Sequence, residues 1–302
     1  MTQFSVIIAT RNRKHQLRRC LEALTNLETP RSAFEIIVVD DGSVVTAAEV
    51  VEGFANRLRV KLLRQQRAGP SRARNQGAKA AIGELLAFTD DDCRPRPDWL
   101  EQFRLTFDRW GSCLLGGAVE DANKDGLCSL ASHLLSYQRY ERYAKDPRYA
   151  PRLGTLNMSV PKADFLTLGG FDEAFTLAAY EDLAFCDRWL ASGRVIHFAL
   201  NASVLHDHPM GLHEFWQQHK RFGRGAKTFY QRCGRSATSR VVSGLFADYA
   251  EVMRGARKAT SGLRRWRLGA LIGLSQIAAA YGYVSAGPCS PARPTPPESV
   301  VE

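Results

Sequence analysis

Apolar residues near the N-terminus occur in short, almost uninterrupted runs that end in polar residues. The first two are "FSVIIAT" at residues 4–10 and "FEIIVVDDGS" at residues 34–43, both rich in β-branched side chains. Such runs are typical of parallel strands that are covered on both faces. Between them, Leu17, Leu21 and Leu24 recur at helical spacing. The pattern predicts a strand, a helix and a strand, the βαβ unit of an α/β fold.

Predicted strands and helices continue to alternate to about residue 208. Residues 71–83 are predicted to form a helix that ends at Gly83, and "ELLAFTDDD" at residues 84–92 the next strand. Residues 154–175 predict a strand, a short helix beginning near Pro161 and a Gly-Gly turn. Residues 181–193 predict a helix, because Gly193 suits the position after a last helical turn. Residues 194–208 predict one or two further strands.

Beyond residue 208 the pattern changes. "LHEFWQQHKRFGRGAKTFYQRCGR" mixes aromatic and basic residues on a predicted helix, and "LGALIGLSQIAAAYGYVSAG" at residues 268–287 is uncharged for 20 residues. That length could just span a bilayer. Its glycines, serines and glutamine weaken the hydropathy, so a helix at a membrane interface or packed on the protein is an equal alternative. Residues 288–302 are Pro-rich and are predicted to be disordered.

The charge of the chain is concentrated in this C-terminal region. The 302 residues carry a formal net charge of +10, and residues 209–267 contain 13 Lys and Arg against 3 Asp and Glu. Such a basic block indicates an anionic partner, namely phosphate, nucleic acid or a lipid head group. A solvated basic helix is the simpler alternative. Hydrophobic residues make up 45% of the chain, enough for a sizeable core.

Cysteine usage and the N-terminus bear on the compartment. The seven cysteines are odd in number, widely spread and without a C-x-x-C pair, so neither a disulfide framework nor a zinc site is predicted. The opening "MTQFSVIIATRNR" lacks the basic region and cleavage site of a secretory signal. We therefore expect a cytoplasmic protein.

Three consecutive aspartates follow the apolar run at residues 85–88. Their mutual repulsion must be offset by solvent, a basic neighbour or a metal ion. On an extended strand end, Asp90 and Asp92 would project to one side and Asp91 to the other. Two carboxylates about 6–7 Å apart along a strand can hold Mg²⁺ or Mn²⁺, which prefer oxygen ligands. A solvated turn is the alternative.

Five motifs in order closely resemble the family 2 glycosyltransferases of the GT-A fold. They are "FSVIIATRNR", "EIIVVDDGS", "GPSRARNQGAKAAIGELLAFTDDDCRP", "GGFDE" and "YEDLAFCDRWLASG", and they cover about residues 4–208. The resemblance implies an α/β fold with a Rossmann-like, mostly parallel sheet flanked by helices. The predicted catalytic domain is then 1–208, with a nucleotide-sugar half of about 1–95 and an acceptor half of about 96–208. A helical extension at 209–287 and the tail at 288–302 follow.

The resemblance implies roles on the donor side. Thr10 and Arg11 would line the nucleotide pocket. Asp41 would hydrogen-bond the base, typically uracil, because a carboxylate accepts from an N–H group. Arg72 or Arg74 would face the diphosphate, since a guanidinium group fits phosphate oxygens. A surface salt bridge is the alternative for either arginine.

A metal site is also implied by the resemblance. Asp90 and Asp92 match the family's DXD motif, and Asp90 would also contact the nucleotide sugar. The bound Mn²⁺ or Mg²⁺ would neutralise the departing diphosphate. Some relatives place a histidine metal ligand near the end of the last strand, where this chain has "VLHDH". His206 is the preferred ligand and His208 remains an alternative.

The acceptor side is predicted from the last two motifs. Glu181 and Asp182 match an acidic pair at the start of a helix, where the helix dipole favours a carboxylate. In the family the second acid resembles the general base that deprotonates the acceptor hydroxyl, which gives single displacement with inversion. Helix capping is the alternative for this pair. Gly169, Gly170 and Asp172 of "GGFDE" would lie on the acceptor side.

The implied activity is hexosyl transfer from a nucleotide diphosphate sugar, preferably a UDP-sugar, to a saccharide or lipid-linked acceptor in envelope or polysaccharide synthesis. The basic extension suggests peripheral attachment to an anionic surface at the inner face of the plasma membrane. Nucleic acid is not an expected partner, and association of identical chains stays open. The alternatives are a nucleotidyltransferase on a related core and a non-catalytic nucleotide- or nucleic-acid-binding module.

Overall fold

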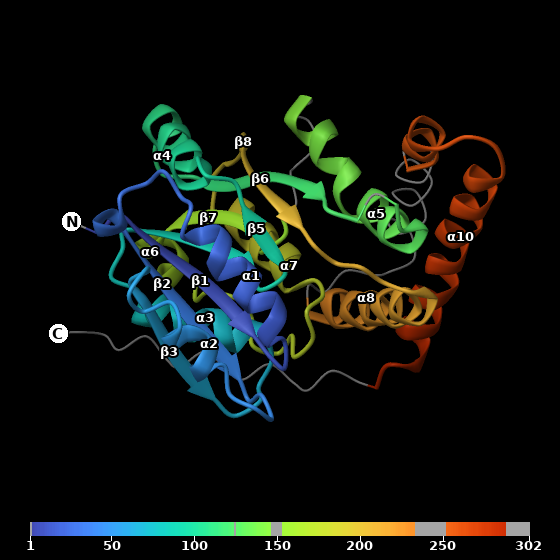
Figure 1. Ribbon diagram of the computed structural model, residues 1–302. Coiled ribbons are helices and arrows are strands. Elements are labelled where there is room, and N and C mark those ends of the chain that lie inside the picture. The colour runs from blue at the N-terminus through green and yellow to red at the C-terminus, as the bar shows by residue number, and fades with distance from the viewer. Residues whose placement is uncertain (1, 124, 146–152, 233–251, 288–302) are drawn as a thin grey trace.

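The computed structural model describes residues 2–123, 125–145, 153–232 and 252–287, and Figure 1 shows their arrangement. One mixed sheet has the strand order β3-β2-β1-β4-β7-β6-β8-β5. Its strands are β1 (Phe4–Thr10), β2 (Phe34–Asp41), β3 (Val60–Gln65), β4 (Leu85–Asp90), β5 (Cys93–Pro95), β6 (Leu114–Asp121), β7 (Asn157–Pro161) and β8 (Ile196–His206).

Helices cover the sheet and extend beyond it. Those around the sheet are α1 (Lys14–Leu24), α2 (Ala48–Glu52), α3 (Pro70–Ala80), α4 (Trp99–Trp110), α6 (Lys162–Thr167) and α7 (Glu181–Ala191), with a 3₁₀ turn η1 (Arg31–Ala33). The remaining helices are α5 (Leu127–Lys145), α8 (Leu212–Arg232) and α10 (Gly262–Ser285), and residues 252–259 are also helical. The helices and strands predicted from the hydrophobic pattern are therefore confirmed within the described residues, with β8 a single strand, but the helix predicted to end at Gly83 ends at Ala80.

Three of the four parallel strands, β1, β2 and β4, are buried on both faces, whereas the edge strand β3 is partly exposed. Strands β1, β2, β3 and β4 pair in parallel. Along β1, Val6 and Ile8 belong to the hydrophobic cluster that contains Leu21 of α1, whereas Ile7 belongs to the cluster that contains Ala73 of α3. Both faces of β1, β2 and β4 are covered, which explains why these strands are apolar at most positions.

The second part of the sheet is mixed. Strand β7 runs antiparallel to β4 and to β6, β6 is parallel to β8, and β5 is antiparallel to β8. The register of β6 and β8 shifts between Gly117 and Ala118. Buried Asn157 stabilises this irregularity, because its Nδ2 donates to the carbonyls of Ala118 (2.8 Å) and Ala202 (2.9 Å). The two parts together confirm the expected mostly parallel α/β sheet.

The C-terminal helices have a separate hydrophobic cluster. It contains Phe215 of α8, Leu268 and Ile272 of α10, and Ala131 and Leu134 of α5. Helices α8 and α10 lie side by side beyond the sheet, with α5 next to them (Figure 1). This cluster agrees with a C-terminal extension, but α5 belongs to the half predicted for the acceptor. The predicted domain boundaries stay a prediction, and residues 288–302, predicted to be disordered, lie outside the described residues.

Candidate active site

The polar residues that follow the apolar runs converge at the carboxyl edge of the parallel strands. Thr10 at the end of β1 pairs in register with Asp40 of β2, and Ala9 with Asp90 at the end of β4. In open α/β sheets this edge is where ligands bind. The register thus brings three of the sequence motifs to one place.

The three consecutive aspartates do not continue an extended strand. Strand β4 ends at Asp90, and Asp91 and Asp92 form a turn before β5. Arg13 reaches both turn residues, with Nη1 2.7 Å from Asp91 Oδ1 and Nη2 2.9 Å from Asp92 Oδ2. The alternation expected for a strand end is therefore wrong here, because the chain turns. A basic neighbour, Arg13, supplies much of the compensation that the repulsion requires.

Arg13 was missed by the sequence reasoning. Its position in "ATRNR", two residues after the first arginine of the motif, was the available signal. Thr10 adds a second contact, because its Oγ1 donates to Asp91 Oδ2 at 2.7 Å. Burial raises the pKa of Asp91 to about 7, even though the charge of Arg13 opposes this shift. Asp91 therefore connects the loop after β1 to the turn after β4.

Three neighbouring side chains stabilise the ionised form of Asp92. Its Oδ1 lies 3.4 Å from His206 Nε2 and its Oδ2 lies 3.3 Å from His208 Nδ1. Burial would raise the pKa of Asp92, but the contacts with the two histidines and Arg13 outweigh it and hold that pKa well below its usual value. The imidazole rings of His206 and His208 stack at 5.3 Å.

One set of side chains could hold a metal ion. Donor atoms of Asp92, Cys93 and His206 all lie within 4.8 Å of one another. Burial raises the pKa of the Cys93 thiol well above its usual value, so this sulfur stays protonated and is a poor ligand. Asp90 is not part of this set. The oxygen and nitrogen donors that remain, from Asp92 and His206, suit Mn²⁺ or Mg²⁺ better than a thiophilic metal.

Arg74 joins the aspartates to the acidic pair of α7. Its Nη2 lies 2.7 Å from Asp90 Oδ1, and its Nη1 lies 2.9 Å from Glu181 Oε1. The Arg74 side chain is only 4% exposed, whereas Arg72 on the same helix faces solvent. The structure thus separates the two arginines that sequence had left open. Contact of Arg74 with a diphosphate stays a prediction.

The acidic pair begins helix α7, and Asp182 is half-buried beside Glu181. Glu181 is buried, and its Oε2 has no hydrogen bond within the described residues. Burial, together with the adjacent Glu181 charge, raises the pKa of Asp182 to about 7. Tyr180, just before the pair, has a left-handed backbone with φ of 71°, which is unusual for a residue other than glycine. A carboxyl group with a pKa near neutrality can take up and release a proton.

The predicted nucleotide residues lie in the loops beside this edge. Asp41 at the end of β2 is buried, and its carboxylate accepts from Gln65 Nε2 (2.7 Å), Ala68 N (2.8 Å) and Gly69 N (3.0 Å). It therefore fixes the loop that leads into α3, with further lone pairs open to a base. Arg11 follows β1, and its buried Nε has no hydrogen bond among the described residues.

The "GGFDE" loop is held by a residue that sequence reasoning missed. Asn75 of α3 forms a reciprocal pair with Phe171, donating to its carbonyl and accepting from its N–H, both at 2.8 Å. Gly169 and Gly170 have φ of 77° and 66°, values that favour glycine. Asp172 forms an ion pair with Arg232 at the end of α8. The loop therefore connects α3 to the C-terminal helices.

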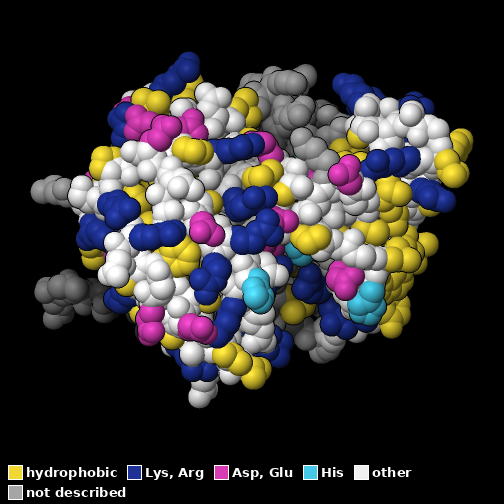
Figure 2. Space-filling model, in the orientation of Figure 1, with side chains coloured by type: hydrophobic (Ala, Val, Ile, Leu, Met, Phe, Trp, Pro, Cys, Tyr) yellow, Lys and Arg dark blue, Asp and Glu magenta, His cyan; other side chains and the backbone are white. Residues whose placement is uncertain are grey.

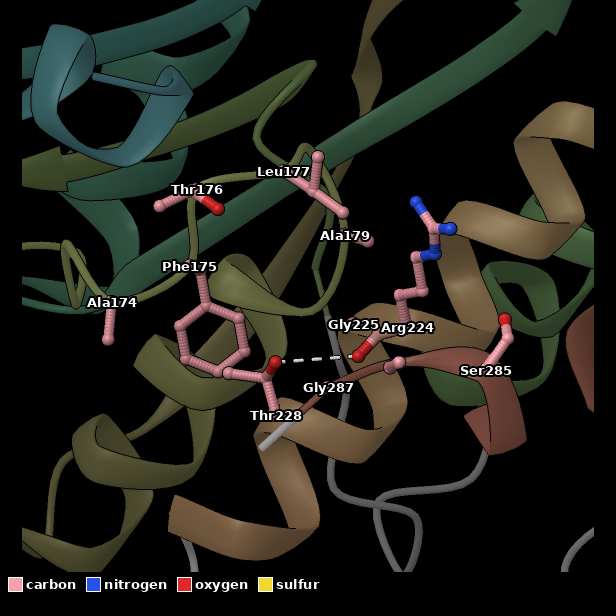
Figure 3. Close-up of a pocket in the computed structure, with 11 residues that line it drawn as sticks. Ala174, Phe175, Thr176, Leu177, Ala179, Arg224, Gly225, Thr228, Ser285 and Gly287 are labelled. Atoms are coloured by element: carbon pink, nitrogen blue, oxygen red, sulfur yellow. Dashed lines mark hydrogen bonds between the residues drawn. The ribbon is translucent and has the colours of Figure 1, made fainter. Parts of the chain in front are cut away.

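A cavity of about 260 Å³ lies next to this loop. Figure 3 shows it between residues 174–179, which lead into α7, and the helices α8 and α10. Arg224 and Thr228 come from α8, and Ser285 from the end of α10. The buried Nε of Arg224 has no hydrogen bond within the described part of the chain. The C-terminal helices therefore contribute to a cavity close to the acidic pair.

Comparison with known proteins identifies the family. Residues 5–160 match Glycosyl transferase family 2. Glycosyltransferase AglE of Haloferax volcanii is 36% identical over 125 residues, 40% of this chain and 41% of the relative. Validoxylamine A glucosyltransferase of Streptomyces hygroscopicus subsp. jinggangensis is 31% identical over 218 residues, 63% of this chain and 51% of the relative. The chain thus spans about half the length, or less, of these relatives.

Solved structures show the same fold. A mannosyltransferase of Pyrobaculum calidifontis, in complex with GDP-Man and Mn2+, superposes with a TM-score of 0.66 at 15% identity, covering 94% of this chain and 87% of that one. Residues 1–349 of TarS from S. aureus, in complex with UDP-GlcNAc, give a TM-score of 0.57 at 18% identity, covering 93% and 89%. The family match spans more than half of the chain and agrees with the geometry at the sheet edge, so this protein belongs to glycosyl transferase family 2.

Proposed function

We propose that the protein is a metal-dependent, inverting glycosyltransferase that moves a sugar from a nucleotide diphosphate sugar to a hydroxyl group of a saccharide or lipid-linked acceptor. A UDP-sugar is the favoured donor, and synthesis of envelope polysaccharide is the proposed setting. The observation that carries the proposal is the Arg74 bridge between Asp90 and Glu181. It holds the aspartates of the DDD turn and the acids of α7 around one site. The family match favours glycosyl transfer over the nucleotidyltransferase and binding-module alternatives.

The metal would be held by Asp92 and His206, with Asp90 as a further ligand. The fit rests on a buried carboxylate and an imidazole nitrogen that lie 3.4 Å apart, beside a thiol that stays protonated. A bound Mn²⁺ or Mg²⁺ would supply positive charge to the diphosphate as it leaves. The mannosyltransferase relative solved with Mn2+ supports a divalent ion. His208 stays the alternative ligand.

Donor recognition is assigned to the loops after β1 and β2 and to helix α3. Thr10 and Arg11 would line the nucleotide pocket, and Asp41 would accept a hydrogen bond from the base. Arg72 or Arg74 would face the diphosphate. Relatives solved with GDP-Man and with UDP-GlcNAc support a nucleotide diphosphate sugar without choosing between the bases.

Acceptor activation is assigned to Asp182. Its carboxylate would take the proton from the acceptor hydroxyl as that oxygen attacks the anomeric carbon, so that the diphosphate departs from the opposite side of the sugar. Glu181, neutralised in part by Arg74, would position Asp182 at the start of α7. Gly169, Gly170 and Asp172 would line the acceptor side, near the cavity in Figure 3. The enzyme would work at the cytoplasmic face of the membrane, with residues 209–287 as anchor.

Calorimetric titration with UDP and GDP, with and without Mn²⁺, tests the proposal. We expect one nucleotide to bind in a Mn²⁺-dependent manner, and Asp92→Asn to abolish that dependence. Asp108→Asn is the matched control, because Asp108 lies on the exposed surface of α4. Nucleotide-sugar turnover is then measured with the donor that carries the preferred base. Unchanged Mn²⁺-dependent affinity in Asp92→Asn would sink the metal assignment.

A further inference from the structure

Helix α10 presents an apolar stripe to solvent along its whole length. Its large exposed side chains are Leu263 (66% exposed), Trp266 (80%), Ile277 (62%), Tyr281 (53%) and Val284 (79%). The intervals between them fit steps of three and four residues, so they share one face. In Figure 2, hydrophobic side chains line the edge of the molecule where α10 lies in Figure 1. An apolar face of this extent marks a contact surface.

The opposite face of α10 fixes the direction of this stripe. Leu268, Ile272 and Ala278 are buried. A Cβ added at Gly282 would lie 2.0 Å from the carbonyl oxygen of Lys220, and one added at Gly223 would lie 1.9 Å from that of Ala279. The backbones of α8 and α10 therefore touch, and α10 cannot turn its apolar stripe inward without breaking this contact.

The charges on α10 and on the helical residues 252–259 before it are all positive. Residues 252–287 contain six Lys and Arg and no Asp or Glu. Arg264, Arg265 and Arg267, in the first turns of α10, are exposed beside Leu263 and Trp266. Near the other end, Lys220 Nζ of α8 lies 4.8 Å from the centre of the Tyr281 ring. An apolar face bordered by cations and by Trp and Tyr side chains suits an anionic lipid surface.

Helix α10 is long and apolar enough to cross a membrane, by length and composition, and it alone is so among the described helices. Its packing argues against crossing. Helix α8 runs beside it and carries Glu214, Lys220 and Arg224. If α10 crossed the hydrocarbon region while packed on α8, these charged side chains would enter it as well, which is strongly unfavourable. A contact through one face of α10 avoids this problem.

We propose that the exposed face of α10 lies in the head-group region of an anionic bilayer, with the helix axis in the membrane plane. Leu263, Trp266, Ile277, Tyr281 and Val284 insert, and the arginines of the first turns contact lipid phosphates. The inference deepens the proposed peripheral attachment and rests on it only for the side of the membrane. The cavity shown in Figure 3, which Ser285 of α10 helps to line, then lies close to the lipid surface.

Vesicle flotation of the full-length protein tests the proposal. We expect it to float with vesicles of phosphatidylcholine and phosphatidylglycerol and to stay at the bottom with phosphatidylcholine alone. Ile277→Glu should reduce flotation at least tenfold, whereas Leu105→Glu, on the exposed surface of α4, should leave it unchanged. Each of Arg264→Gln and Arg267→Gln should weaken partitioning about fivefold, as expected for one cation near an anionic surface. Failure of the full-length protein to float at low salt overturns the proposal.

Two further measurements separate this surface from its rivals. Subtracting the emission spectrum of Trp266→Phe from that of the unmodified protein isolates the fluorescence of Trp266. This emission should shift to the blue when vesicles are added, and lipids brominated at shallow positions should quench it. Quenching by deeply placed bromine would mean that α10 crosses the bilayer. Light scattering without vesicles should give a monomer; a dimer that Ile277→Glu dissociates would assign the stripe to a second copy.

Mn²⁺-dependent nucleotide binding, measured without vesicles, should persist in Ile277→Glu. If the unmodified protein shows no Mn²⁺-dependent nucleotide binding, the proposed transferase mechanism is wrong, but the proposed lipid contact of α10 is unaffected.

Discussion

At the scale of single residues, the candidate site balances buried carboxylates against two arginines. Arg13 forms ion pairs with Asp91 and Asp92, and Arg74 forms ion pairs with Asp90 and Glu181. Breaking a buried pair by removing one partner typically costs about 3–5 kcal/mol, because a buried charge is left uncompensated. These arginines are therefore expected to be necessary for the site to form, whatever they also contact during catalysis.

Arg74→Met tests this expectation. It leaves Glu181, which is 3% exposed, without its cation, so we expect a loss of about 3–5 kcal/mol in the free energy of unfolding. The measurement is urea denaturation followed by circular dichroism. Arg72→Met on the same helix is the control, since Arg72 is exposed and its removal should change stability by less than about 0.5 kcal/mol. Equal effects of the two substitutions would contradict the buried bridge.

Asp182 gives a prediction for the rate of transfer. As the proposed general base it must be ionised, so the rate should rise with pH and level off above its pKa of about 7. Asp182→Asn should lower the rate by about 10²–10⁴-fold, with nucleotide affinity nearly unchanged. Asp187→Asn, one turn further along α7, serves as the control. A variant Asp182→Asn that keeps most of its turnover would move the base to Glu181 or Asp172.

The same pKa predicts an effect on stability. The folded pKa of Asp182 is raised from 3.8 to about 7. Between these values the folded protein binds more protons than the unfolded chain, so Asp182 makes stability fall as pH rises from about 4 to 7. Asp182→Asn should therefore melt at the same temperature as the parent at pH 4 and at a higher temperature at pH 8. Equal melting temperatures at pH 8 would mean that Asp182 is ordinarily solvated.

At the scale of elements, the strands and helices near the motifs could be predicted from sequence because burial determines which positions along an element must be apolar. Val6, Ile7 and Ile8 are all fully buried, and a run without polar interruptions is the signature of such a strand. The direction of β7 could not be predicted. Its sequence, NMSVP, carries no sign of its direction, and only the pairing with β4 and β6 makes it antiparallel.

Single residues of the candidate site could be placed from sequence where one motif puts them at the end of an element. Asp90 and His206 end β4 and β8 and Glu181 begins α7, while their roles in binding and catalysis stay predictions. The contacts between motifs could not be predicted, because they depend on side-chain reach across long sequence separations. Arg13 and Asp91 are 78 residues apart, and Asn75 and Phe171 are 96 apart. The motif "ATRNR" points to the neighbourhood of Arg13, but nothing in the local sequence of Arg13 or Asn75 indicates its distant partner.

The contact between α8 and α10 gives an element-scale prediction. Gly282→Ala would place a Cβ 2.0 Å from the carbonyl oxygen of Lys220, so the two helices must separate, at a cost of about 1–3 kcal/mol. Gly273→Ala on the same helix meets nothing within 4 Å and should stabilise by up to about 1 kcal/mol through helix propensity. Thermal denaturation of both variants checks the sign of each change. Destabilisation by Gly273→Ala as well would mean that the loss at Gly282 is not specific to its close contact with Lys220.

At the scale of the whole molecule, the C-terminal helices are tied to the catalytic edge by several contacts. Gln218 of α8 bonds His208 at 3.2 Å, and Arg232 pairs with Asp172. Gly225 is in tight contact with the loop that precedes α7, since a Cβ there would lie 2.7 Å from the carbonyl oxygen of Ala179. A displacement of α8 would therefore reach both His208 and the loop that carries Tyr180 and Glu181. The extension is therefore expected to shape the active site as well as to serve as the proposed anchor.

Gly225→Ala tests this coupling. The added methyl group must push the loop at Ala179 away from α8, and that loop leads within three residues to Asp182. Since a misplacement of about 1 Å in a catalytic group can cost about 10²-fold in rate, we expect kcat to fall strongly while nucleotide affinity is kept. The matched control is Gly223→Ala, also on α8, whose Cβ would instead meet the Ala279 carbonyl of α10. Both variants should lower the melting temperature, but only Gly225→Ala should slow transfer at temperatures where each remains folded. A parallel fall of kcat in both variants would show that loss of α8 packing in general, and not the position of the loop before α7, limits the reaction.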